Sequence, residues 1–406
     1  MLSEFKQKLK GKIWRYIKDL FHNEIESEPG LIQNINFDPA RAQKTILISY
    51  LTHGYFVDFR KYSGRTVLLE IAAIIKIFSQ LDYCIDLINC NDIKAIDPIK
   101  QKKYDLIFGF GEVFYQMSQI RPEAKTLLYL TEQHPEFSYR EEKKRLDYFY
   151  ERHHKTLPIV RSGVFYKTIH LQRKYTNVIT LSEVEPLLEQ YNRPYVLFPT
   201  GIFNTKAEIE NKNHHTARKN FLWLGSTGFV HKGLDLLIDV FQTRTDINLH
   251  ICGLHESDRK LMTTPKRDNI FDHGHVDIAS ERFIKIISSC SYSVLPSCSE
   301  GFSTSITTSM LHGLIPVVMK DTGFNRLHDK AILLNDYKIE YLDNVLTELS
   351  EISPESIKVL SKKNYDFAHQ EFKISAFEKK FQNIIEDFMK QTDENSTYSK
   401  ASAHIG

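Results

Sequence analysis

Short apolar runs and segments with helical periodicity alternate along the first half of the chain. The run at 44–51 (KTILISYL) is typical of a buried strand, and the segment at 64–81 (GRTVLLEIAAIIKIFSQL) has the spacing of a helix. Further strands are predicted at 83–89, 104–111, 125–131, 177–182 and 195–201. Strands that alternate with helices are typical of a parallel α/β sheet, so this half predicts one Rossmann-like unit.

The same alternation restarts near residue 221 and continues almost to the end of the chain. Strands are predicted at 221–226, 247–253, 292–297 and 314–320. Helices are predicted between them at 233–243, 281–290 and 303–313. The second half therefore predicts a second unit of the same kind.

Two helices are predicted at the C-terminal end. Ser353 and Pro354 have the N-cap and first-turn chemistry of the first helix, and Ser375 with Glu378 fits a capping box for the second. An apolar stripe on the second helix predicts that it packs against a core; it consists of Phe377, Phe381, Ile384 and Phe388.

The pattern and the length of 406 residues favour an α/β protein of two Rossmann-like, doubly wound domains that face a central cleft. The predicted division is a basic amphipathic helix at 1–25, an N-terminal domain at 26–203, a linker at 204–220, a C-terminal domain at 221–372, a terminal helix at 373–390 and a disordered tail at 391–406. In such folds ligands bind at the carboxyl ends of the strands, so the loops that leave the strands are the candidate site.

Composition narrows the class of protein. Lys and Arg number 53 against 51 Asp and Glu, so charge does not indicate a nucleic-acid partner. The five cysteines are an odd number without a C-x-x-C pair, which is typical of reduced thiols in a cytoplasmic protein. No apolar run approaches the roughly 18 residues that a transmembrane helix needs.

The first segment has its own pattern. Apolar residues from Leu2 to Leu20 recur at helical spacing, with Lys and Arg on the flanks, so residues 1–23 fit a helix that lies on an anionic membrane surface. A terminal helix packed on its own domain, or one that binds a partner protein, fits the same pattern equally well.

A lone carboxylate precedes a run of small hydroxyl residues in the stretch PSCSEGFSTSITTSMLHGLIPVV, residues 296–318. Ser303, Thr304 and Ser305 can cap the helix that follows, and Gly313 suits its C-terminal end. The unpaired N–H groups of a helix start favour an anion such as phosphate. Glu300 is then directed past the phosphate toward hydroxyl groups of a sugar, or it only complements the helix dipole.

A second loop fits the same ligand. In FLWLGSTGFVHKGLDLL, Gly225 ends a strand and Lys232 precedes a helix after a loop of small residues. A lysine there is placed to neutralise a diphosphate, although a solvated surface lysine gives the same pattern.

Together these motifs resemble the C-terminal domain of GT-B glycosyltransferases, in particular the retaining family 4 type of bacterial O-antigen and capsule pathways. The motifs are the Gly225 loop with Lys232, the ICG at 251–253 and the stretch at 296–318. VITLSEVE…VLFPTGIFN resembles the end of the first domain of that family, and KTILISYLTHG with SGRTVLLEIA resembles its opening.

The resemblance implies a nucleotide-sugar donor site. Lys232 would hold the donor diphosphate, Glu300 would contact the donor sugar, and the N–H groups around Gly301, Phe302, Ser303 and Thr304 would bind phosphate. In the first domain, Gly64 matches a glycine near the donor phosphates, and His134 matches a histidine that contacts the donor sugar.

Two positions depart from the family pattern. The family usually has a second glutamate that binds the nucleotide ribose, where this chain has Thr308. It often has an arginine directly after the strand-end glycine, where this chain has Ser226. These departures leave open how ribose and diphosphate are held.

The sequence thus favours a hexosyltransferase that moves a sugar from a nucleotide-sugar donor to a saccharide or lipid-linked acceptor with retention of configuration. No Asp-x-Asp occurs, so no metal and no other cofactor is expected. The expected location is the cytoplasm, and residues 1–23 would attach the protein to the inner membrane face where they form a membrane-surface helix. A non-catalytic nucleotide-sugar-binding subunit and a nucleotide-sugar epimerase of the same fold are the alternatives.

Overall fold

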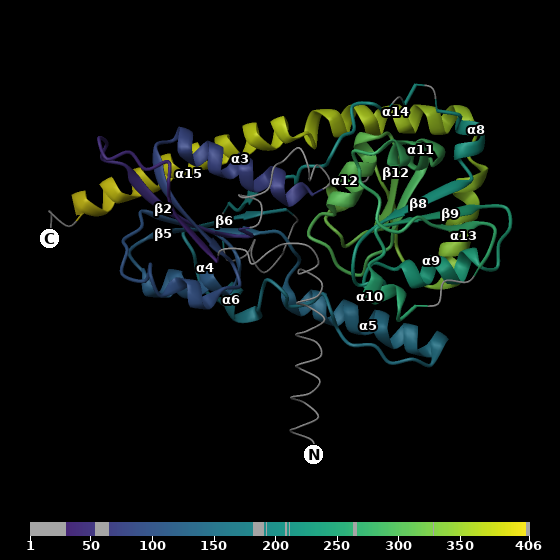
Figure 1. Ribbon diagram of the computed structural model, residues 1–406, viewed down its shortest axis with the longest axis horizontal. Coiled ribbons are helices and arrows are strands. Elements are labelled where there is room, and N and C mark those ends of the chain that lie inside the picture. The colour runs from purple at the N-terminus through teal and green to yellow at the C-terminus, as the bar shows by residue number, and fades with distance from the viewer. Residues whose placement is uncertain are drawn as a thin grey trace, which may run out of the picture.

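The computed structural model describes residues 30–52, 65–181, 191, 193–207, 209–210, 212–262, 266–327 and 329–402. The predicted N-terminal helix at 1–25 and Gly64 lie outside these residues. Two sheets, one parallel and one parallel except for an edge strand, lie side by side, each between layers of helices (Figure 1).

The first sheet has the strand order β1-β3-β2-β4-β5-β6-β7, and all pairs are parallel except β1 with β3. Its strands are β1 Leu31–Ile35, β2 Lys44–Tyr50, β3 Tyr83–Asn89, β4 Leu106–Gly109, β5 Lys125–Leu130, β6 Asn177–Thr180 and β7 Tyr195–Val196. Its helices are α3 Thr66–Gln80, α4 Gly111–Ile120, α5 Pro135–His153 and α6 Thr168–Gln172. Figure 1 shows α3 on one side of this sheet and α4 and α6 on the other, as a doubly wound fold requires.

The second sheet is parallel throughout, with the order β10-β9-β8-β11-β12-β13. Its strands are β8 Asn220–Leu224, β9 Asn248–Cys252, β10 Ile270–Asp272, β11 Tyr292–Leu295, β12 Ile315–Met319 and β13 Ile332–Leu334. Its helices are α8 His214–Ala217, α9 Leu234–Phe241, α10 Glu256–Arg259, α11 Glu281–Ser289, α12 Thr304–Leu311, α13 Ile339–Glu351 and α14 Pro354–Glu371. The structure confirms two Rossmann-like domains, and every strand predicted from the sequence is present.

The last helix, α15 Ile374–Ser402, returns to the first domain and packs on α3. Phe381 is fully buried there, with its ring 5.9 Å from that of Phe78 and 5.5 Å from that of Phe108. Lys76 on α3 pairs with Glu378 at 2.9 Å. The last helix of the chain therefore completes the core of the first domain.

The start and the end of α15 differ from the prediction. The helix begins at Ile374, so Ser375 lies in its first turn instead of capping it, and Glu378 pairs with Lys76 across the interface. The helix also continues to Ser402, where the sequence favoured an end at residue 390 and a disordered tail. Ser353 does cap α14, because its hydroxyl accepts the N–H of Ser356 at 3.1 Å.

Helix α5 was not predicted, because its sequence is strongly polar and most of the residues on its buried face are themselves polar. It leaves the first domain and lies along the second (Figure 1). Arg152 forms ion pairs with Asp235 and Asp239 of α9. The rings of Tyr148 and Tyr337 lie 5.6 Å apart. The domains are thus joined by α5 on one side and by the α14–α15 connection on the other.

Within the described residues, no helix combines the length and hydropathy needed to cross a membrane.

We expect Phe381→Ala to lower the free energy of unfolding by about 3–5 kcal/mol, because it leaves a cavity between α15 and the first-domain core. Urea unfolding measures this loss. The control is Lys379→Ala on the exposed side of the same helix, which should change stability by about 0.5 kcal/mol or less. An equal effect of the two substitutions would show that α15 does not contribute to the core.

Candidate functional site

The loop after β11 leads directly into helix α12. Ser303 stands at the N-cap with an extended backbone, but its side chain makes no capping hydrogen bond. Its hydroxyl instead lies 2.9 Å from that of Ser305. The hydroxyl run therefore does not cap the helix as predicted, and the first N–H groups of α12 keep their capacity to bind an anion. Gly313 follows the helix with a φ of +73°, the left-handed conformation expected of it.

Lys232 and Glu300 meet at this helix start. Their Nζ and Oε1 atoms lie 2.6 Å apart, with side chains only 8% and 14% exposed. The hydroxyl of Ser297 donates to the same oxygen at 3.0 Å. Burial raises the pKa of Glu300, but the positive charges of Lys232, His231 and Arg161 lower it to about 2. Glu300 is therefore ionised and can accept hydrogen bonds from hydroxyl groups.

A glycine allows the two loops to approach so closely. Gly233 has a φ of +67°, and a Cβ atom there would lie 2.6 Å from the carbonyl oxygen of Pro296. The indole N–H of Trp223 donates to the carbonyl oxygen of Lys232 at 3.2 Å, which fixes the backbone of the lysine. Backbone geometry, and not only charge, thus places Lys232 beside Glu300.

His231, next to Lys232, joins three segments. Its carbonyl oxygen accepts the N–H of Cys298 at 2.8 Å, and its Nε2 donates to the carbonyl oxygen of Ser299 at 2.7 Å. Its Nδ1 lies 3.5 Å from Oε2 of Glu142 on α5 and 3.4 Å from Sγ of Cys298. Burial lowers the pKa of His231, but Cys298 and Glu142 raise it to about 10. A charged imidazole therefore connects the lysine loop, the Glu300 loop and α5.

Glu142 is the partner of His231 and is itself only 1% exposed. It accepts the N–H groups of Val160 at 2.9 Å and Ser162 at 2.8 Å, and the hydroxyl of Ser162 at 2.6 Å. Burial raises the pKa of Glu142, but His231 and Ser162 lower it to about 2. One carboxylate thus holds both His231 and the chain after α5.

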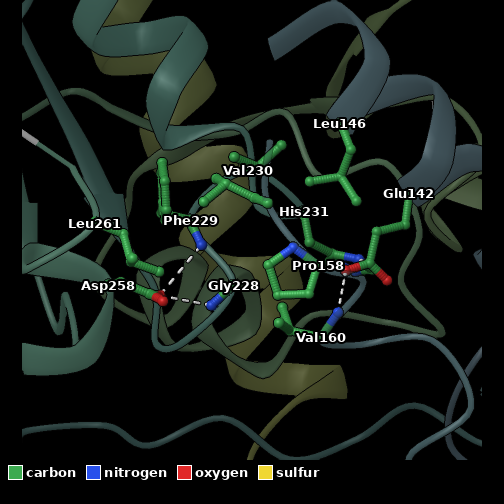
Figure 2. A pocket seen from close by; sticks show the side chains of 11 residues that line it. Glu142, Leu146, Pro158, Val160, Gly228, Phe229, Val230, His231, Asp258 and Leu261 are labelled. Atoms are coloured by element: carbon green, nitrogen blue, oxygen red, sulfur yellow. Dashed lines mark hydrogen bonds and ion pairs between the residues drawn. The ribbon is translucent and has the colours of Figure 1, made fainter. Parts of the chain in front are cut away.

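Figure 2 shows Glu142 and His231 at one end of a pocket between α5 and the second domain. Apolar side chains such as Leu146 and Pro158 also line the pocket. At the other end Asp258 accepts the N–H of Gly228 at 2.6 Å and of Phe229 at 3.2 Å. The pocket therefore lies behind the Lys232 loop, and its polar groups fix that loop from both ends.

Glu132 comes from the first domain and completes the charged cluster. Strand β5 ends at Leu130, and Glu132 is the second residue after it. The backbone of Thr131, the residue between them, lies so close to Gly301 that a Cβ atom would not fit at the glycine. Burial raises the pKa of Glu132; the charge of Arg161 opposes this rise and that of Glu300 adds to it. Two carboxylates, one from each domain, therefore lie within electrostatic reach of Lys232. Only the position of Glu132 at a strand end could have indicated it.

His134 is placed differently from its expected role. It is the N-cap of α5, and its Nδ1 accepts the N–H of Glu136 at 3.3 Å. Burial lowers its pKa. A capping function accounts for this geometry, and contact with a donor sugar stays a prediction.

The strand-end loop of β8 holds two further predicted residues. Gly225 lies under the ring of Trp223, which leaves no room for a side chain. Ser226 is exposed.

Thr308 is 1% exposed, and its hydroxyl accepts the N–H of Ile202 at 3.1 Å. It therefore holds the segment that enters the second domain. The ring of Phe302 packs 4.1 Å from that of Phe324 and 5.3 Å from that of Phe198, so only its backbone is available to a phosphate. Donor contacts of these residues remain predictions.

Among the described residues, no three His, Cys, Asp or Glu side chains are arranged to hold a metal ion.

The Glu142–His231 pair predicts how stability depends on pH. Glu142→Gln should lower the free energy of unfolding by about 3 kcal/mol near pH 6, because it leaves a buried imidazolium without its carboxylate. The contribution of Glu142 is complete above pH 4.5 and is lost as pH falls toward about 2. That of His231 is complete below pH 6.5 and is lost as pH rises through about 10. The difference between the wild type and Glu142→Gln should therefore shrink from pH 6.5 to pH 10.

Urea unfolding at several pH values measures this difference. Glu151→Gln, at an exposed position on the same helix, is the control and should show little loss at any of them. A loss in Glu142→Gln that does not change with pH would contradict an ionised pair.

Residues 218–350 match the family described as glycosyl transferases group 1. No curated protein matches the chain at the sequence level. The solved structure of Anabaena HepE in complex with UDP-glucose has a TM-score of 0.55 and 14% identity, over 84% of this chain and 99% of that chain. Sucrose-phosphate synthase from Thermosynechococcus elongatus has a TM-score of 0.57 and 12% identity, over 86% of this chain and 100% of that chain. The chain therefore has the GT-B fold, and its second domain carries the match to the glycosyl transferases group 1.

Proposed function

We propose that the protein transfers a sugar from a nucleotide-sugar donor to a saccharide or lipid-linked acceptor, with retention of configuration. The observation that carries this proposal is the contact between Lys232 and Glu300 at the open start of α12, within the segment that matches the glycosyl transferases group 1. The similar HepE structure was solved with UDP-glucose, which makes UDP-glucose the first donor to test.

In this proposal, Lys232 and the N–H groups at the start of α12 bind the donor diphosphate and stabilise the charge that grows on it. Glu300 accepts hydrogen bonds from the sugar hydroxyls. The bond between the anomeric carbon and the phosphate oxygen breaks, and the acceptor oxygen bonds to that carbon on the same face. The departing phosphate oxygen takes the acceptor proton, so no nucleophile from the protein is required.

Donor binding would also rearrange the contact between Lys232 and Glu300. Lys232 is paired with Glu300 at 2.6 Å, so a diphosphate has to share the lysine or draw it away from the carboxylate. The carboxylate that is released can then turn to the sugar. Donor binding would thereby direct Glu300 toward the sugar that it orients.

The direct test is incubation with a panel of nucleotide sugars and glycoside acceptors, with product detection by mass spectrometry and the configuration read by NMR. Transfer with retention supports the proposal. Binding without turnover would favour a non-catalytic subunit, which the buried Thr308 and the exposed Ser226 motivate. Isomerisation of the donor without acceptor would favour an epimerase.

Glu300→Gln and Lys232→Ala should separate contact with the sugar, the role proposed for Glu300, from diphosphate binding, the role proposed for Lys232. Glu300→Gln keeps the shape but loses the charge, so turnover should fall by about tenfold or more while nucleoside-diphosphate affinity does not fall. Lys232→Ala should weaken both nucleoside-diphosphate binding and turnover. Calorimetry with UDP and steady-state kinetics measure these effects. If Glu300→Gln weakens UDP binding as much as turnover, Glu300 does not act on the sugar.

We also propose that the protein serves the synthesis of cell-surface polysaccharide and binds the membrane through residues 1–23. This segment has six basic and two acidic residues, and each basic residue near an anionic surface contributes about 1 kcal/mol. The full chain should co-sediment with vesicles that contain phosphatidylserine at low salt, and a chain without residues 1–23 should not. That shorter chain should still act on a soluble acceptor. Vesicle binding that ignores salt and lipid charge would contradict the anchor.

A further inference from the structure

The loop between α5 and α6 brings Arg161 from the first domain to the donor loop of the second. Its backbone N–H lies 3.2 Å from Oε1 of Glu142, the carboxylate that also holds His231. Its aliphatic stem lies on Gly228, where an added Cβ would be 2.8 Å from Cγ and 3.2 Å from Cδ of the arginine. Backbone and stem are thus both held in place.

The guanidinium group acts electrostatically on the charged cluster of Lys232, Glu300 and Glu132. Burial has the largest influence on the pKa of Glu132 and raises it. The charge of Arg161 has the next largest influence and lowers it. Arg161 also lowers the pKa of Glu300. With the residues that the structure describes, the guanidinium makes no hydrogen bond and no ion pair within 4 Å, although its backbone is bound. Arg161 therefore has a fixed position and free donors.

The other cations near the site already have anionic partners. Lys232 is paired with Glu300, and His231 with Glu142. The loop of Gly225, Ser226, Thr227 and Gly228 carries no charge. A diphosphate brings about two or three negative charges next to the largely buried Lys232 and Glu300, and desolvated charges are stable only when they are paired. Of these three cations, only Arg161 can neutralise part of that charge without breaking an existing pair.

We propose that Arg161 is a second phosphate-binding residue, which reaches the donor diphosphate from the first domain across Gly228. This inference rests on the proposed nucleotide-sugar donor. A guanidinium group offers five N–H donors in a planar fork, so it can hold two phosphate oxygens at once. The diphosphate then contacts Lys232 of one domain and Arg161 of the other, so the donor bridges the two domains.

The competing explanation is that Arg161 only compensates the buried charge of Glu132. In that case its loss would raise the pKa of Glu132 and alter stability, but it would not change phosphate affinity selectively. Binding of UDP and of uridine distinguishes the two, because only UDP carries the phosphates.

The test uses the full chain and isothermal titration calorimetry with UDP and uridine, and extends to other nucleoside diphosphates if UDP does not bind. Arg161→Gln should weaken UDP binding by about tenfold to a hundredfold, and should reduce the salt dependence of that binding. Arg161→Lys keeps the charge but loses the fork, so it should show a smaller loss. Uridine binding should not change. Arg140→Gln, on the exposed side of α5, is the control and should bind UDP as the wild type does.

The outcomes separate this inference from the proposed function. If the wild type and Arg161→Gln bind UDP equally while Lys232→Ala does not, Arg161 is no phosphate ligand and the donor site stands. Equal losses of UDP and uridine affinity would assign Arg161 a structural role. If Arg161→Gln does not fold, Arg161→Lys provides the test. If Arg161→Lys binds UDP with the affinity and salt dependence of the wild type, Arg161 does not hold two phosphate oxygens at once. If the wild type binds no nucleoside diphosphate, the proposed function fails, and this inference fails with it.

Discussion

The buried ion pair between Glu142 and His231 is the interaction on which the arrangement of the site depends. His231 fixes the positions of the Lys232 and Glu300 loops relative to each other, and Glu142 fixes both relative to α5 and the chain at 160–162. A buried charge without its partner is costly, and His231 and Glu142 lie on different domains. The pair therefore favours the one relative position of the domains in which both charges meet. The charges of the candidate site are therefore positioned by a contact between domains.

This arrangement explains why the sequence predicted the fold better than the site. The central strands are continuous apolar runs such as 44–50 and 83–89, and a buried parallel strand requires little else. Short edge strands such as β1 and β10 lack that signal, because few of their residues are buried. Helix α5 was missed because most of its surface faces water and its buried residues contact another domain.

The site residues divide in the same way. Lys232 and Glu300 stand in motifs with local chemistry, a helix start and a strand end, and the sequence showed both. Glu142 and Arg161 are ordinary charged residues in sequence, and their roles arise from contacts with His231 and Gly228, 89 and 67 positions away. Thr308 drew attention only through the family pattern; in the structure its hydroxyl accepts the N–H of Ile202, and a donor contact there stays a prediction. Long-range pairing of this kind has no periodicity and no motif that a single sequence could reveal.

The return of α15 to the first domain has a consequence for the order of folding. The rings of Phe78 and Phe108 are covered by Phe381, which the ribosome adds about three hundred residues after the first of them. During synthesis the N-terminal domain therefore has all of its strands but an uncovered apolar face on α3. It cannot complete its core until the second domain has been made. A chain that ends before α15 therefore leaves this apolar face of the first domain open to aggregation and proteolysis.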